Sequence, residues 1–454
     1  MEERKYYPLS SAQYALIGLA NLVNDLNATA LIAHVDFRSD INDDVMIRAI
    51  QETYRRLPYC RVRIHRDEEG SLSQYLSDEP APAVPVEYLT SEQEKHQDEI
   101  FRKWNLEYMP DGFFETCLTN MRLIHYEDGH KGLYYCIQHI IMDGYAGIYT
   151  LEYVSRVYIA MMEGKELPAP GPLPWDLVLD DMAYVGSEEY NKKLAKFVDK
   201  HYVTEPQFTS INGLGSHEFF PGKRYGEAQH DDQFFAKVIR HPMDKAFTDR
   251  IDEAAAKSHL SPQIYFLLAI RSYLAAVSDS DDVMVNCLIS RRSTKYQKAA
   301  GMTLANSHWV RTIYPDTVSF SEALSRVYDV QSDCYRNARL KRDDVVRLVH
   351  ERFNTPPEGC YGSVWLTYFP KKELPLDTLN LDVDYVSQGF IPIPLYVMIL
   401  PDSTRGTMSA TYWHAYNYIQ PESIEKLHAF TLKFLTKGIE NPDKSIKELV
   451  NECL

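Results

Sequence analysis

Strand patterns and helix patterns alternate along almost the whole of this chain. Residues 29–37 have the pattern of a strand, and residues 60–65 alternate in polarity as a half-buried strand does. Residues 42–57 between them carry apolar side chains near helical spacing. The alternation restarts beyond residue 234 and continues to a long helical pattern over 421–437. The sequence therefore predicts an α/β (α+β) protein built of mixed sheets and helices.

A stretch rich in proline and glycine interrupts this alternation. Residues 164–175, GKELPAPGPLPW, cannot hold a regular element. The chain of 454 residues is also longer than one compact core accommodates. We therefore predict an N-terminal lobe over 1–175 and a C-terminal lobe over 176–454.

Charge and cysteine usage exclude several classes of partner. The net charge is -16 and the basic clusters are short, which argues against nucleic acid and against an anionic membrane surface. The seven cysteines are scattered without a C-x-x-C pair, so we expect neither a metal site nor a disulfide framework. The N-terminus lacks an apolar segment, and the apolar run 391–400 is too short to span a membrane. We expect a cytoplasmic protein.

The segment His139-Ile-Ile-Met-Asp143-Gly144 carries the chemistry. It lies between a predicted strand, 132–138, and a predicted helix, 148–162. A neutral imidazole, whose pKa is ~6.5 when unperturbed, can accept a proton from an alcohol or amine that attacks a carbonyl. Asp143 suits a buried salt bridge with an arginine better than contact with the imidazole, and Gly144 permits a close turn. The flanking apolar residues fit a structural core histidine equally well, so the motif alone leaves both interpretations open.

Several further segments, in the same order, resemble the superfamily of chloramphenicol acetyltransferase, the condensation domains of peptide synthetases and related acyltransferases. Residues 8–13, PLSSAQ, are similar to the P-L-S-x-x-Q opening of condensation domains. Residues 57–63, LPYCRVR, resemble a strand whose first arginine pairs with the motif aspartate, and residues 290–311 resemble a later G-R…G-x-F-x-N stretch. The resemblance implies two lobes that face each other across a tunnel, with Arg61 as the partner of Asp143.

The chain departs from the family pattern at one position beside the motif. Condensation domains usually carry two histidines, H-H-x-x-x-D-G, and Gln138 stands in the place of the first. Alternation along the strand directs Gln138 away from the face that His139 occupies. The departure argues against peptide condensation more than against catalysis by His139.

Members of the superfamily stabilise the tetrahedral oxyanion with a hydroxyl or amide donor from the second lobe. By the resemblance, Thr367 in the predicted strand 363–369 and Asn306 in the stretch 290–311 are the candidates. Each has a structural alternative, because β-branched residues favour strands and asparagine closes turns.

The resemblance implies an acyltransferase that moves an acyl group from a thioester to an alcohol or amine, with His139 as general base. The donor would be coenzyme A or the phosphopantetheine of a carrier protein, without a metal or a permanently bound cofactor. Two alternatives stay open: an amide-forming condensation enzyme that uses carrier-bound substrates, and a binding or docking module without catalysis. We expect a monomer, since one chain supplies both lobes.

Overall fold

The structure is a computed structural model that describes residues 4–22, 26–109, 112–213, 235–355, 361–370, 379, 381–389, 391, 393–402, 405–416 and 418–454. The chain forms two compact units. Unit 1 comprises 1–187, 290–305 and 370–390, and unit 2 comprises 188–289, 306–369 and 391–454. This division differs from the predicted lobes, 1–175 and 176–454, because two later segments join unit 1. Much of the loop-rich region predicted around 203–228 lies outside the described residues.

Unit 1 is built on a five-stranded sheet in the order β11-β1-β6-β5-β4. Only β4 and β5 pair in parallel. The strands are β1 (Ala30–Phe37), β4 (Val86–Leu89), β5 (Thr119–Tyr126), β6 (Lys131–Gln138) and β11 (Leu381–Val386). The structure confirms the strands predicted over 29–37 and 132–138.

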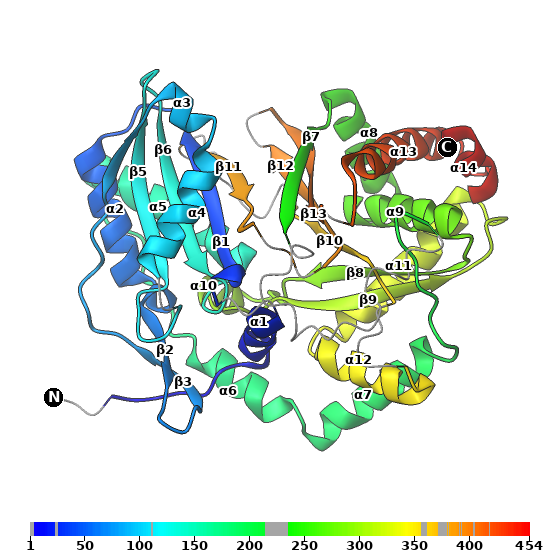
Figure 1. Ribbon diagram of the computed structural model, residues 1–454, viewed down its shortest axis with the longest axis horizontal. Helices are drawn as coiled ribbons and strands as arrows, with labels where there is room; N and C mark the ends of the chain where they lie inside the picture. The colour runs from blue at the N-terminus through cyan, green and yellow to red at the C-terminus, as the bar shows by residue number, and fades with distance from the viewer. Residues whose placement is uncertain are drawn as a thin grey trace. The chain divides into compact units, whose positions relative to one another are not determined.

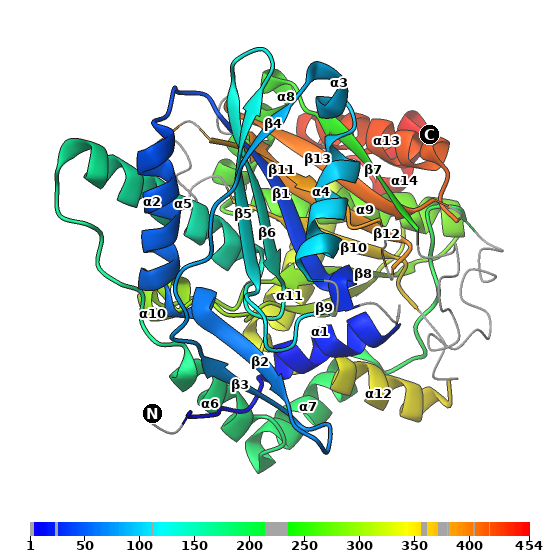
Figure 2. The same ribbon diagram turned by 60° about the vertical axis from the view of Figure 1, so that its left-hand side comes forward.

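Helices cover both faces of this sheet. The apolar stripe of α2 (Asp43–Arg56) shares one core with α5 (Gly144–Glu163), and the two helices cover the same face (Figure 1). On the other face, α4 (Gln97–Tyr108) packs Phe101 and Trp104 against the sheet (Figure 2). Asn42 caps α2 by accepting a hydrogen bond from the backbone of Val45, which explains why the predicted helix starts there.

The remaining elements of unit 1 are short and lie around the sheet. They are α1 (Ser11–Leu22), η1 (Leu26–Thr29), η2 (Pro58–Arg61), β2 (Val62–Arg66), β3 (Leu72–Leu76), α3 (Ser91–Glu94), α6 (Trp175–Tyr184) and α10 (Lys295–Ala299). Strands β2 and β3 form an antiparallel ribbon of their own. The proline-rich stretch 164–175 holds no regular element before α6 begins at its last residue, as predicted.

Unit 2 is built on a six-stranded sheet in the order β7-β13-β12-β10-β8-β9. Strand β10 pairs in parallel with both β8 and β12, and the other pairs are antiparallel. The strands are β7 (Ala236–Pro242), β8 (Asp282–Ile289), β9 (Asn306–Ile313), β10 (Val364–Tyr368), β12 (Leu395–Asp402) and β13 (Thr407–Ala415). The mixed pairing in both sheets confirms the predicted α/β class.

Seven helices are described in unit 2. They are α7 (Glu188–His201), α8 (Lys245–Ser258), α9 (Pro262–Ser278), α11 (Phe320–Arg336), α12 (Arg342–Phe353), α13 (Pro421–Glu440) and α14 (Ile446–Cys453). Ser261 caps α9 and Pro262 occupies its first turn, which explains why the helix starts there. No single helix in the described part of the chain has the length and apolar character to cross a membrane. Helices α8 and α9 have that length and apolar character only when taken together, and the pair is bent by 107°.

Substitution of a glycine in segment 290–305 tests how tightly this segment packs in unit 1. Gly301 has φ +65°, and a Cβ there would lie 2.0 Å from Cδ1 of Tyr59. We expect Gly301→Ala to lower the free energy of unfolding by about 3 kcal/mol, since it combines an unfavourable φ with a clash in the core. Urea unfolding measures the loss. Gly164→Ala is the control, because Gly164 has φ +62° and open space around it. Equal losses in the two variants would show that the packing against Tyr59 is not as described.

Candidate active site

His139 follows the last residue of β6, and its backbone is held on both sides. Its N–H donates to the carbonyl oxygen of Thr29 at 3.2 Å. Its carbonyl oxygen accepts a hydrogen bond from the hydroxyl of Thr303, in the segment 290–305. The strand end therefore fixes the position of the histidine, as the motif predicted.

The imidazole of His139 lies in surroundings that favour its neutral form. Burial lowers the pKa of His139 below its usual value of 6.5, and the carboxylate of Asp143 and the histidine's own backbone only partly oppose this effect. Among the described residues, no group donates to or accepts from its buried Nδ1 atom. The side chain is thus a neutral base at pH 7, without a carboxylate hydrogen-bonded to it.

Gln138 belongs to a separate hydrogen-bond group. Its side chain is fully buried, and the amide nitrogen donates to Oδ1 of Asn27 at 3.4 Å and to Sδ of Met109 at 3.6 Å. Its amide oxygen accepts from the hydroxyl of Thr29 at 3.4 Å. The residue in the place of the family's first histidine therefore ties the strand end to the loops around residues 27 and 109.

Asp143 is surrounded by hydrogen-bond donors. It is the N-cap of α5, and its Oδ1 accepts from the backbone of Ala146 at 2.9 Å. Nη2 of Arg292 lies 2.8 Å from each carboxylate oxygen. The backbone N–H groups of Leu304 and Ala305 donate to Oδ2 at 3.0 and 3.1 Å. The carboxylate thus joins the start of α5 to both ends of the segment 290–305.

Arg292 completes this arrangement from its own segment. The arginine side chain in the pair is 0% exposed and that of Asp143 is 2% exposed. The guanidinium also donates to the carbonyl oxygens of Gln297 and Met302, which closes the loop around α10. Met302 forms a β-bridge with Met142 of the motif loop. Charge pairing and backbone bonding therefore act on the same short segment.

The pairing predicted between Arg61 and Asp143 is wrong. Nη1 of Arg61 donates to the carbonyl oxygen of Ser77 at 3.3 Å, and its carboxylate neighbour is the exposed Asp78 at 3.8 Å. Arg61 is the last residue of η2, and both of these partners lie in the loop after β3. Sequence order showed which arginine matched the family strand, but not the direction of its side chain.

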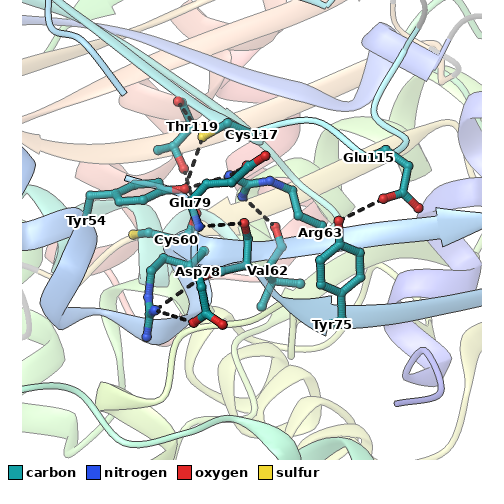
Figure 3. Close-up of polar contacts among 12 residues, drawn as sticks. Tyr54, Cys60, Val62, Arg63, Tyr75, Asp78, Glu79, Glu115, Cys117 and Thr119 are labelled. Atoms are coloured by element: carbon teal, nitrogen blue, oxygen red, sulfur yellow. Dashed lines mark hydrogen bonds and ion pairs between the residues drawn. The ribbon is translucent and has the colours of Figure 1, made fainter. Parts of the chain in front are cut away.

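The second arginine of that strand is also engaged elsewhere. Arg63 is buried, and its Nη2 donates to the hydroxyl of Tyr54 at 2.7 Å and to Oε2 of Glu79 at 3.1 Å (Figure 3). The arginine that does reach Asp143 stands in the Ser290-Arg291-Arg292 string, which the sequence comparison had singled out without assigning it a partner.

Gly144 and the two candidate oxyanion donors have local roles in the structure. Gly144 is the first residue of α5, so its backbone is helical rather than unusual. In unit 2, the amide of Asn306 donates to the carbonyl oxygens of Ala338 and Leu340 at 2.8 and 2.6 Å. The hydroxyl of Thr367 lies 2.7 Å from that of Tyr396. Oxyanion stabilisation by either residue stays a prediction.

The chemistry available at His139 is that of a neutral base. Asp143 is committed to Arg292 and to backbone donors, so it does not serve as a second acid or base. Across the residues that the structure describes, no group of three or more His, Cys, Asp or Glu side chains has the arrangement of a metal site.

The sequence matches the model of a known protein family. The model of the condensation domain matches residues 3–354. The chain belongs to the condensation-domain family. It is 24% identical over 351 residues to surfactin synthase subunit 1 of Bacillus subtilis and 19% identical over 455 residues to tyrocidine synthase 2 of Brevibacillus parabrevis. These matches cover 76% and 99% of this chain, but the chain spans only 9% and 12% of the two synthases.

Solved structures of condensation domains share the fold. The first condensation domain of the calcium-dependent antibiotic synthetase, in complex with a substrate analogue, superposes with a TM-score of 0.80 at 17% identity, over 98% of this chain and 99% of that one. The condensation domain of the monacolin K polyketide synthase gives 0.79 at 15% identity, over 97% and 99%. The starter condensation domain of rhizomide synthetase, in complex with C8-CoA, gives 0.77 at 16% identity, over 97% and 96%.

Two arginine variants test which ion pair supports the motif. We expect Arg292→Ala to lower the free energy of unfolding by about 3–5 kcal/mol, because it leaves the Asp143 carboxylate buried without its charge partner. Arg61→Ala should cost less than about 1 kcal/mol, since its partner Asp78 is exposed. Urea unfolding of both variants gives the comparison. A larger loss in Arg61→Ala would restore the pairing expected from sequence.

Proposed function

We propose that this chain is an acyltransferase that moves an acyl group from a thioester to an alcohol or amine, with His139 as its general base. The observation that carries the proposal is the neutral imidazole at the end of β6, whose backbone is hydrogen-bonded on both sides. A base for this reaction must be unprotonated near neutral pH and fixed in position, and His139 meets both conditions.

The reaction needs one proton acceptor and one oxyanion donor. His139 takes the proton from the acceptor's hydroxyl or amine as that group attacks the thioester carbonyl. The tetrahedral intermediate then collapses, the carbon–sulfur bond breaks, and the thiol leaves with a proton from the imidazolium. We propose Thr367 rather than Asn306 as the oxyanion donor. Both amide hydrogens of Asn306 are donated to carbonyl oxygens, whereas the hydroxyl of Thr367 can accept from that of Tyr396 and keep its own hydrogen for the oxyanion.

The donor is proposed to be an acyl group on a phosphopantetheine thiol, either of coenzyme A or of a carrier protein. Two observations support this class. The rhizomide synthetase domain that shares the fold is in complex with C8-CoA. The curated relatives that the chain matches in part are peptide synthases. Ester and amide products both fit the same base.

Replacing the base tests the assignment directly. We expect His139→Ala to fold normally and to lose at least ~100-fold in kcat, because general-base catalysis contributes that much or more. Release of free thiol from acyl-CoAs and from acyl-loaded carrier protein, with mixed alcohol and amine acceptors, measures turnover. His65→Ala, which alters a half-exposed histidine of β2, is the control. Undiminished turnover in His139→Ala would remove the general-base role, and no release by the wild type from either donor would favour a binding module.

The acid limb of the pH profile is a second test. Because burial lowers the pKa of His139 below its usual value of 6.5, the midpoint of the acid limb of kcat/KM should lie below pH 6.5. Protonation there also opposes folding, because the unfolded chain binds the proton more readily than the folded one. A pH–rate profile from pH 5 to 9 with stability checked at each point gives the apparent pKa. An acid limb centred above pH 6.5 would contradict the buried neutral histidine.

A further inference from the structure

Helices α9, α11 and α13 of unit 2 pack on one face of its sheet. Cys287 of β8 is buried next to Cys334 of α11, and both burial and this neighbouring thiol raise its pKa. The hydroxyl of Tyr412 in β13 lies 3.0 Å from Nδ1 of His428 in α13. Contacts of α9 with β8 and of α11 with β9 complete this helix-covered face (Figure 1). Residues one position along each strand point to the opposite face.

Aromatic side chains form a row across that opposite face. Asn286 of β8 is the register partner of Trp309 on one side and of Trp365 on the other. Trp365 is opposite Tyr396, and Tyr396 is opposite Trp413. Register partners share a face, so these five residues form one line across β9, β8, β10, β12 and β13. We call them the aromatic row, and three of the chain's five tryptophans belong to it.

Three rings of the row are neighbours in space, and the guanidinium of Arg342 in α12 lies 5.1 Å from the ring centroid of Trp365. The rings of Trp365 and Tyr396 lie 6.5 Å apart and those of Tyr396 and Trp413 lie 6.3 Å apart, each pair close to edge-to-face. Asn286 is the member between Trp309 and Trp365. A carboxamide in this position places a hydrogen-bonding group among rings that otherwise offer apolar contact.

The amide of Asn286 has no partner of its own. The residue is 0% exposed, and among the described residues nothing donates to its Oδ1 or accepts from its Nδ2. Nε1 of Trp413 is likewise buried, and no described residue accepts its hydrogen. Folded proteins rarely leave both halves of a buried amide unpaired, so the group points to a ligand. An amide that offers one donor and one acceptor together matches a secondary amide, which carries an N–H beside a C=O.

We propose that Asn286 and the aromatic row bind a secondary amide of the substrate, with its methylene groups against the rings. This inference rests on the proposed function, which requires substrates that carry such amides. The amide can come from the pantetheine arm of the thioester donor or from an aminoacyl acceptor. Both sources have the same chemistry, an N–H and a C=O on a short aliphatic chain.

Fluorescence titration tests the inference without turnover, because three tryptophans lie in the row. The first probe is the S-octyl thioether of pantetheine, which cannot transfer an acyl group, and the second is an N-acetyl amino acid methylamide. Each is compared with an analogue in which an ester replaces the amide. We expect the wild-type full chain to bind one of the two amide probes at least tenfold more tightly than its ester analogue. Preference for the pantetheine probe identifies the donor arm, and preference for the amino acid probe identifies the acceptor.

Variants on one strand separate the amide contact from general effects. Asn286→Leu should remove the preference for amide over ester, whereas Cys287→Ala, its neighbour on the helix-covered face, should retain it. Equal affinity for amide and ester in the wild type, or a preference that survives in Asn286→Leu, would overturn the inference. If Asn286→Leu fails to fold, the comparison of amide and ester in the wild type decides alone. Thiol release is measured separately, so a binding preference without turnover contradicts only the proposed function.

Discussion

The buried ion pair between Asp143 and Arg292 is the interaction on which the candidate site depends. A carboxylate removed from water is stable only when its lone pairs are satisfied, and Asp143 accepts from a guanidinium and from three backbone N–H groups. Those donors come from α5 and from the segment 290–305, which lies far along the chain. One side chain therefore fixes two parts of unit 1 at the point where β6 ends.

His139 depends on the same construction. The segment that Asp143 holds also supplies Thr303, whose hydroxyl binds the carbonyl oxygen of His139. The aspartate thus positions the histidine through the backbone instead of through the ring. This leaves the imidazole neutral, since no carboxylate among the described residues is hydrogen-bonded to it and burial disfavours its charged form. For the function proposed above, a base without an acidic partner suffices, because the leaving thiol itself requires little activation.

Local patterns predicted much of the fold but little of the long-range geometry. Helix α2 and the strands β1 and β6 follow from periodicity and capping that act within a few residues. Strand β11 was not predicted, because it has six residues and pairs with β1 across more than three hundred positions. The same limit explains Arg61. A family pattern places an arginine in sequence, whereas the direction of its side chain depends on η2 and on the loop after β3.

The sequence nevertheless marked the motif and the string that contains its partner. His139 and Asp143 belong to the predicted motif, and Arg292 lies in the stretch 290–311 that resembles the family pattern. Only the connection between Asp143 and Arg292 was missing. Asn286 gave no such signal, since an asparagine in a strand is unremarkable until the register places it between Trp309 and Trp365. Functional groups of this kind appear only when the pairing of strands is known.

A double-mutant cycle on Asp143 and Arg292 tests the central claim most directly. The free energies of unfolding of Asp143→Ala, Arg292→Ala and the double variant are measured by urea unfolding, with the wild type as reference. If the two side chains depend on each other, the double variant should lose at least about 2 kcal/mol less than the sum of the single losses, because it leaves no buried charge unpaired. Additive losses would show that Asp143 and Arg292 act independently, and would contradict the account of how His139 is held.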